Sequence, residues 1–207
     1  MGPEERAAAE ADVRRLCERG AYDEATTAAL GVYGREVLRY LCAAHESETD
    51  ASEIFSVFAE DLWKGLPGFA WECSLRTWSY TLARRAAARV LRQKWRARAV
   101  LGSSPAISQK LQDIRTETLA YLRTETKTRL RALRDSLDED DRALLMLRID
   151  RGLAWDELAR VFADSELDAA ALKREAARLR KRFQLVKEKL RDLAQREGHV
   201  PPKDGED

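Results

Sequence analysis

Histidine and cysteine are scarce in this chain of 207 residues, which has two histidines and three scattered cysteines, Cys17, Cys42 and Cys73. Zinc sites and disulfide frameworks need several such residues at short, regular spacings. The sequence also lacks a carboxylate pair, a glycine-rich phosphate loop and a nucleophile arrangement typical of an active site. We therefore expect no enzymatic activity, no metal, no cofactor and no small-molecule substrate.

Long apolar runs are missing as well. No segment approaches the roughly 20 apolar residues that span a bilayer. The first residues, Met1-Gly-Pro-Glu-Glu-Arg6, have no apolar core of the kind found in a signal peptide. These absences predict a cytoplasmic protein without a membrane partner.

Turn-forming and aromatic residues are few, with ten Gly, five Pro and 7% aromatics, whereas 35% of the residues are charged. Alanine, leucine, arginine and glutamate dominate, and these residues favour helices. We expect an all-α fold of two small helical domains joined by a linker. The formal net charge of +1 predicts no partner, so the distribution of charge carries the argument.

Acidic and basic residues form separate blocks along the chain. The stretch from Ser74 to Arg98 has eight Lys or Arg residues and no acid. Like charges on one helix repel, so this stretch is either a solvated basic face or the binding surface for an anionic partner. Between Arg39 and Lys64 the chain has six acids and no Lys or Arg: Glu46, Glu48, Asp50, Glu53, Glu60 and Asp61.

The basic stretch has the pattern of a helix. Ser74 is the expected N-cap. Apolar residues recur at helical spacing at Leu75, Trp78, Leu82 and Ala86. We expect Arg76, Tyr80 and Arg84 to project away from this stripe, and a second line to hold Arg85, Arg89, Arg92 and Arg96. The preceding loop, 65–73, carries Phe69 and Trp71.

Other helices are marked by their caps and breakers. We expect a helix over 4–19 that Gly20 ends, and a second from Asp23 that Gly31 and Gly34 either bend or divide. A capping box with Asp50 as cap and Glu53 reaching back predicts the start of the next helix. Residues 99–108 lose all periodicity and form the predicted linker, where we place the domain boundary.

The C-terminal half has three periodic segments. Asp138 caps a helix that Gly152 closes, a short helix follows over 153–163, and a basic helix begins near Asp168. A short helix, a turn and a basic helix are the layout of a helix-turn-helix, whose second helix enters the major groove of DNA. The tail, 197–207, is predicted to be disordered.

Two stretches resemble bacterial RNA polymerase sigma factors of the extracytoplasmic-function type. Trp63-Lys-Gly-Leu-Pro-Gly-Phe69 and the run from Ser74 to Ala86 look like sigma region 2. Leu137–Ile149 and Gly152–Ala159 look like the opening of region 4, and Leu172-Lys-Arg with Arg178–Phe183 resembles its recognition helix. The resemblance implies these divisions: an N-terminal helical extension (1–24), region 2 (25–98), a linker with a partial helix (99–128), region 4 (129–196) and the tail.

The resemblance implies a role for each block. Region 2 would bind the β′ coiled coil of core polymerase through Asp50, Glu53, Ser56, Glu60 and Asp61, and the polymerase β flap and an anti-sigma factor are further expected partners. The melted minus-ten element would be captured by Phe69, Trp71, Arg76, Tyr80, Arg84, Arg85, Arg89 and Arg92. Region 4 would read the minus-thirty-five element of promoter DNA through Lys173, Arg174, Arg178, Lys181 and Arg182.

The sequence departs from the family pattern at two places. Ser56-Val57 replaces the usual Gln-Glu pair of the polymerase-binding helix, and the turn over 163–168 is about three residues longer. Residues 1–24 and roughly 105–128 lie outside the resemblance, and the first of these segments is either a brace on region 2 or a docking site for a regulator. Two alternatives therefore stay open: a helix-turn-helix regulator that does not join polymerase, and a helical interaction protein derived from a sigma factor.

Overall fold

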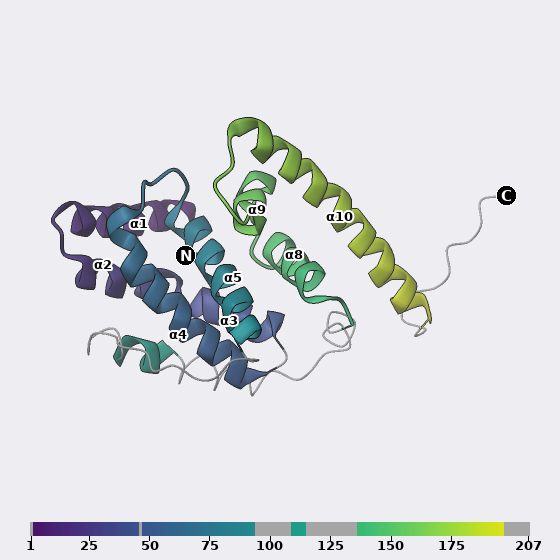
Figure 1. Ribbon diagram of the computed structural model, residues 1–207, viewed down its shortest axis with the longest axis horizontal. Coiled ribbons are helices and arrows are strands. Elements are labelled where there is room, and N and C mark those ends of the chain that lie inside the picture. The colour runs from purple at the N-terminus through teal and green to yellow at the C-terminus, as the bar shows by residue number, and fades with distance from the viewer. Residues whose placement is uncertain (1, 46, 94–108, 115–135, 197–207) are drawn as a thin grey trace. The chain divides into compact units, whose positions relative to one another are not determined.

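The computed structural model describes residues 2–45, 47–93, 109–114 and 136–196. Within these ranges 84% of the residues are helical and none forms a strand, which confirms the predicted all-α class (Figure 1). Contacts between Cα atoms divide the chain into two compact units, residues 1–125 with 160–164 and residues 126–159 with 165–207.

The first unit is a helical bundle in which α4 and α5 lie side by side (Figure 1). Both helices contribute fully buried side chains to its core, among them Phe55, Phe58 and Leu75. Burial of such apolar surface is the main force that holds helices together. The elements are α1 (Pro3–Glu18), α2 (Tyr22–Ala29), a π-helical segment (Leu30–Gly34), α3 (Arg35–Ala44), α4 (Glu48–Gly65), a 3₁₀ turn (Leu66–Gly68) and α5 (Leu75–Gln93).

The chain leaves α1 through Gly20, as the sequence predicts. Gly20 has a φ of +72°, a conformation that glycine adopts without a Cβ penalty. Its amide donates to the carbonyl of Cys17 at 2.9 Å, and the amide of Ala21 donates to the carbonyl of Leu16 at 3.0 Å. These bonds satisfy carbonyl groups that the end of a helix leaves unpaired.

The stretch around Gly31 and Gly34 is continuous, because the π-helical segment joins α2 directly to α3. Residues 109–114 form a helical segment whose Leu111 and Ile114 are buried. A Cβ atom at position 34 would lie 2.7 Å from Cδ1 of Ile114, closer than real side-chain contacts. Glycine at position 34 therefore lets Ile114 approach the backbone of this segment.

The predicted capping box at the start of α4 is wrong. Ser47, not Asp50, is the N-cap, and its Oγ accepts a hydrogen bond from the amide of Asp50 at 3.2 Å. The helix begins at Glu48, so Asp50 already lies in its first turn, where its charge complements the helix dipole. Glu53 is exposed on the second turn.

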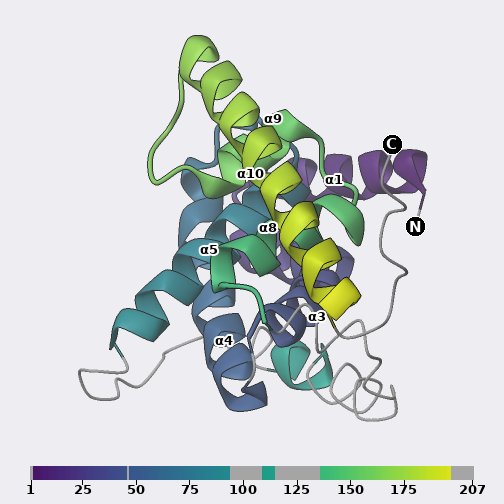
Figure 2. The same cartoon turned by 90° about the vertical axis from the view of Figure 1, so that its right-hand side faces the viewer.

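The second unit contains α8 (Glu139–Ile149) and α10 (Ala169–Arg196), which pack on each other (Figure 2). Asp138 caps α8 as predicted, accepting from the amide of Asp141 at 2.9 Å. Gly152, with a φ of +67°, lies where the chain turns after α8. Asp168 caps α10, its Oδ1 accepting from the amide of Ala171 at 2.7 Å.

The short helix α9 spans Trp155–Phe162, and residues 163–168 separate it from α10. Leu153, Leu158 and Val161 are buried, as its pattern predicts. Trp155 lies edge-on against Phe183 of α10, with ring centroids 5.6 Å apart. This contact ties the start of α9 to the middle of α10.

The boundary placed at 99–108 and the tail 197–207 lie outside the described residues, as do Glu46 and Arg96. Across the described helices, none combines the length and apolar character that crossing a membrane requires.

Candidate nucleic-acid interface

The helix α5 begins at the predicted N-cap. The Oγ of Ser74 accepts a hydrogen bond from the amide of Thr77 at 3.0 Å, and its carbonyl accepts from the amide of Trp78 at 3.0 Å. Leu75 and Ala86 of the predicted apolar stripe are fully buried. Trp78 and Leu82 are half-buried, so the buried face of α5 is rotated relative to the prediction.

Arg76 and Tyr80 do not project into solvent, contrary to the prediction. Tyr80 is 1% exposed and Arg76 is 9% exposed. The reason is Glu36 of α3, whose Oε1 accepts from Nε of Arg76 and from the hydroxyl of Tyr80, each at 2.9 Å, and also pairs with Nη2 of Arg76. A buried charge must be paired and hydrogen-bonded, and this cluster satisfies that requirement within the protein.

Tyr80 is also packed as a core aromatic. Its ring lies edge-on against Tyr40 of α3, with centroids 5.4 Å apart and planes at 86°. Edge-to-face pairs of this kind add stability beyond the buried area. As placed, Tyr80 and Arg76 connect α5 to α3 and do not present a surface to a nucleic acid.

The loop before α5 carries an aromatic cluster that includes both predicted loop residues. Phe69 stacks on Trp78, with centroids 4.3 Å apart and planes at 11°, and lies 4.8 Å from the ring of Trp71. All three side chains are partly exposed. Stacked, partly exposed rings are the kind of surface on which unpaired bases bind.

Two backbone features fix this cluster. A Cβ atom at Gly65 would lie 2.9 Å from Cζ2 of Trp78, so glycine there leaves space for the indole. Trp71 has a φ of +60°, a left-handed conformation that is costly for a bulky residue. Such strain persists where surrounding contacts hold the residue, and it is typical of binding loops.

The predicted line of arginines on α5 is only partly available. Arg85 is exposed and has no ion-pair partner among the residues that the structure describes. Arg84 is half-buried. Arg89 pairs with Asp61 of α4 at 2.6 Å, and Nε of Arg92 donates to the carbonyl of Ala88 at 2.9 Å.

The residues predicted to bind polymerase lie on α4 without forming one open acidic surface. Glu53 is exposed, Glu60 pairs with Lys64 at 2.5 Å, and the hydroxyl of Ser56 donates to the carbonyl of Ser52 at 3.0 Å. Burial raises the pKa of Asp61, although the Arg89 guanidinium opposes that shift.

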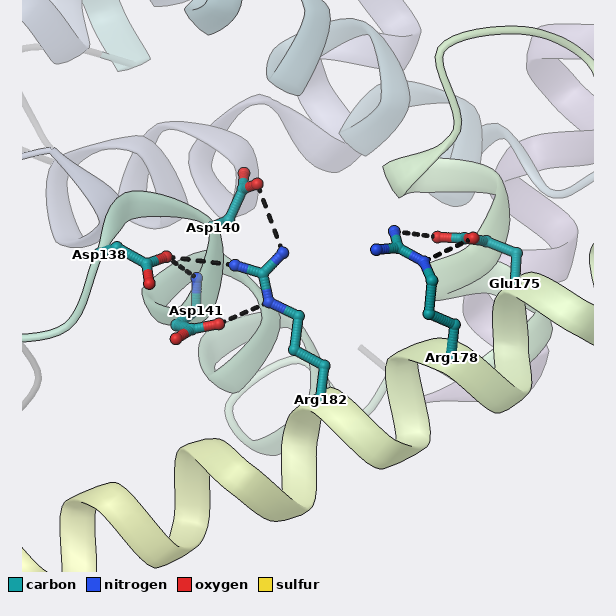
Figure 3. Close-up of polar contacts among 6 residues, drawn as sticks. All are labelled: Asp138, Asp140, Asp141, Glu175, Arg178 and Arg182. Atoms are coloured by element: carbon teal, nitrogen blue, oxygen red, sulfur yellow. Dashed lines mark hydrogen bonds and ion pairs between the residues drawn. The ribbon is translucent and has the colours of Figure 1, made fainter.

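The second unit uses one predicted DNA-binding arginine for its own structure. Figure 3 shows Arg182 pointing from α10 toward three acids at the start of α8. Its guanidinium lies 2.6 Å from Asp141, 3.2 Å from Asp138 and 3.5 Å from Asp140. Because its guanidinium is shared among three carboxylates, Arg182 connects the two helices and is not available to hydrogen-bond with base edges.

Arg178 is paired differently, with a neighbour on its own helix (Figure 3). Its Nη2 lies 2.6 Å from Oε1 of Glu175, and its Nε lies 2.9 Å from Oε2. Arg178 itself is exposed whereas Glu175 is half-buried, so the arginine side of this pair faces solvent. Lys173, Arg174 and Lys181 are exposed, and the structure gives them no ion pair within its described ranges.

Two acids that the sequence analysis missed organise the first unit. Glu36 joins α3 to α5, and Glu10 of α1 accepts bonds from the first amides of α5. Neither residue has a sequence signal, because its partners on α5 lie 40 or more positions away. A search of the described residues finds no group of three or more His, Cys, Asp or Glu side chains able to hold a metal.

No protein-family model, curated protein or solved structure matches this chain.

Proposed function

We propose that the protein is a dissociable RNA polymerase sigma subunit, which binds core polymerase and promoter DNA. The observation that carries the proposal is the partly exposed cluster of Phe69, Trp71 and Trp78 at the start of the basic helix α5. Capture of a melted strand requires aromatic surfaces for bases and cations for the backbone. Arg85 supplies an exposed cation on the same helix.

The second unit supports a duplex-binding role. Its helix α10 presents Lys173, Arg174 and Lys181 to solvent, whereas Arg182 holds the helix on α8. A helix fixed in this way and lined with exposed cations suits the major groove. We assign Lys173, Arg174, Arg178 and Lys181 to the minus-thirty-five element, and Arg182 to positioning of the helix.

The polymerase-binding surface would use exposed acid on α4. Glu53 is exposed there, and Glu60 and Asp61 engage cations that a polymerase surface would have to replace. Complementary charge mainly accelerates association and fixes orientation. The protein itself forms no covalent bond in this function. Its binding energy for the open strand offsets the cost of unpairing, which is a few kcal/mol per extruded base.

The test is co-purification of the full chain with core RNA polymerase, followed by run-off transcription from a library of genomic fragments. We expect a stable complex and transcripts that start at a defined set of fragments. DNA binding without polymerase binding would contradict the proposal and favour a helix-turn-helix regulator. Loss of both activities would favour a helical interaction protein.

A further inference from the structure

The helix α1 reaches the start of α5 through two side chains on one face. Glu10 and Arg14 are four residues apart, so they project from the same side of α1, one turn from each other. Oε2 of Glu10 accepts a hydrogen bond from the amide of Leu75 at 3.1 Å. Oε1 accepts from the amide of Arg76 at 3.1 Å and from the hydroxyl of Tyr33 at 2.6 Å.

Glu10 thus caps α5 from another helix. The first amides of a helix have no partner inside it, and the positive end of its dipole favours a carboxylate. Ser74 supplies the local cap to Thr77, and Glu10 supplies partners to the two preceding amides, those of Leu75 and Arg76. The backbone at the start of α5 is therefore fixed by α1 as well as by its own N-cap.

Arg14 extends the same contact to the aromatic loop. Its Cζ lies 5.6 Å from the ring centroid of Trp71, within the range of a cation–π interaction. Trp71 is the residue with a φ of +60°, and its ring lies beside Phe69. One face of α1 therefore contacts both the strained loop residue and the helix that follows it.

We propose that Glu10 and Arg14 are positioning residues, through which α1 holds the loop of Phe69 and Trp71 and the start of α5 in the arrangement that captures a melted strand. This inference rests on the proposed function. It assigns α1 the part of a brace on the first unit, with no DNA contact of its own. The alternative role for residues 1–24, a docking site for a regulator, makes no use of these contacts.

The experiment compares Glu10→Ala with Glu4→Ala, which removes the same charge from an exposed position on α1. Each full-length variant is assembled with core polymerase, and two quantities are measured: its affinity for core polymerase and its opening of a duplex fragment that the wild type transcribes. We expect Glu10→Ala to lower opening about tenfold, since the loss of a helix cap changes an equilibrium constant by a factor on the order of ten. Its affinity for core polymerase stays unchanged, and Glu4→Ala matches the wild type in both assays.

Two further variants sharpen the result. Glu10→Gln keeps an oxygen that accepts one amide bond but loses the charge, so we expect an intermediate loss of opening. Arg14→Ala is expected to lower opening about threefold, with Arg19→Ala as its exposed control. Hydrogen exchange of the Leu75 and Arg76 amides in the free protein reports the cap independently of polymerase.

The outcomes separate the two proposals. Wild-type opening by Glu10→Ala, or an equal loss of core affinity and opening, overturns the inference and leaves the sigma function standing. If the wild type itself fails to bind core polymerase, the proposed sigma function is contradicted. Faster exchange at Leu75 and Arg76 in Glu10→Ala then identifies Glu10 as a structural cap alone, which also overturns the inference.

Discussion

Arg182 and Lys181 are neighbours on α10 with opposite situations. Arg182 faces three carboxylates at the start of α8, whereas Lys181 is exposed. The charge of a residue on a basic helix therefore does not decide whether it contacts DNA or holds the helix in place. The role of the residue depends on whether its side of α10 faces α8 or solvent.

Arg182→Ala should destabilise the second unit. The substitution removes a guanidinium that pairs with three acids at the start of α8, and we expect a loss of about 1 kcal/mol of unfolding free energy, since the group is partly exposed. Arg174→Ala, an exposed control on the same helix, should leave stability within about 0.5 kcal/mol of the wild type. Urea denaturation measures both, and equal stability of the two variants would contradict the structural role of Arg182.

Asp138 gives the second unit a dependence on pH. Burial disfavours its ionised form, but the hydrogen bonds with Asp141 and the charges of Arg182 and Lys189 outweigh this effect and lower its pKa. Because the folded pKa lies below the unfolded value of about 3.9, the stabilisation is present above that value and is lost as the pH falls through the folded pKa.

Asp138→Asn tests this dependence, since asparagine still caps a helix but carries no charge for Arg182. We expect the variant to be less stable than the wild type at pH 7, by about 1 kcal/mol or less, and the difference to shrink below about pH 4. Thermal unfolding from pH 3 to pH 7 measures it. A difference that is constant over this range would assign the effect to the cap geometry and not to the charge.

At the scale of the element, helix ends are largely predictable and contacts between helices are not. Ser74, Asp138 and Gly20 act as predicted because each signal lies within a few residues of the bond it makes. The prediction of Asp50 as a cap is wrong because Ser47, three residues earlier, is an equally good cap. The burial of Tyr80 could not be predicted, because it depends on Glu36, which lies 44 residues away.

The π-helical segment offers a matched pair of glycines for an element-scale test. A Cβ atom at Gly34 would lie 2.7 Å from Ile114, whereas one at Gly31 would lie 3.9 Å from Lys110. Gly34→Ala should therefore displace residues 109–114 and cost about 1–3 kcal/mol of stability. Gly31→Ala should be neutral or slightly stabilising, because alanine reduces the entropy of the unfolded chain.

Tryptic cleavage after Lys110 and hydrogen exchange over 109–114 measure this displacement. Both should increase in Gly34→Ala and stay at the wild-type level in Gly31→Ala. Equal protection of the segment in the two variants would show that Ile114 moves aside without cost.

At the scale of the whole molecule, the two units present different surfaces, and the proposed function gives each a different form of DNA. The first presents stacked aromatic rings and Arg85, which suit a single strand, and the second presents a row of exposed cations on α10, which suits a duplex. Two sites on one chain raise each other's effective concentration along one DNA molecule. The proposed function therefore needs both units on the same promoter fragment.

Salt dependence separates these contributions, because each phosphate contact that is removed lowers the slope of log K against log salt by about one. We expect Arg85→Ala and Lys181→Ala each to reduce the slope of promoter binding by the polymerase complex by about one, and the double variant by about two. The effects should add, since the two residues lie on different units and share no partner within the described chain.

Arg182→Ala is the control, because its guanidinium is occupied by carboxylates and its loss should leave the slope unchanged. A reduced slope in Lys181→Ala with an unchanged slope in Arg85→Ala would confine DNA binding to the second unit, as expected for a helix-turn-helix regulator.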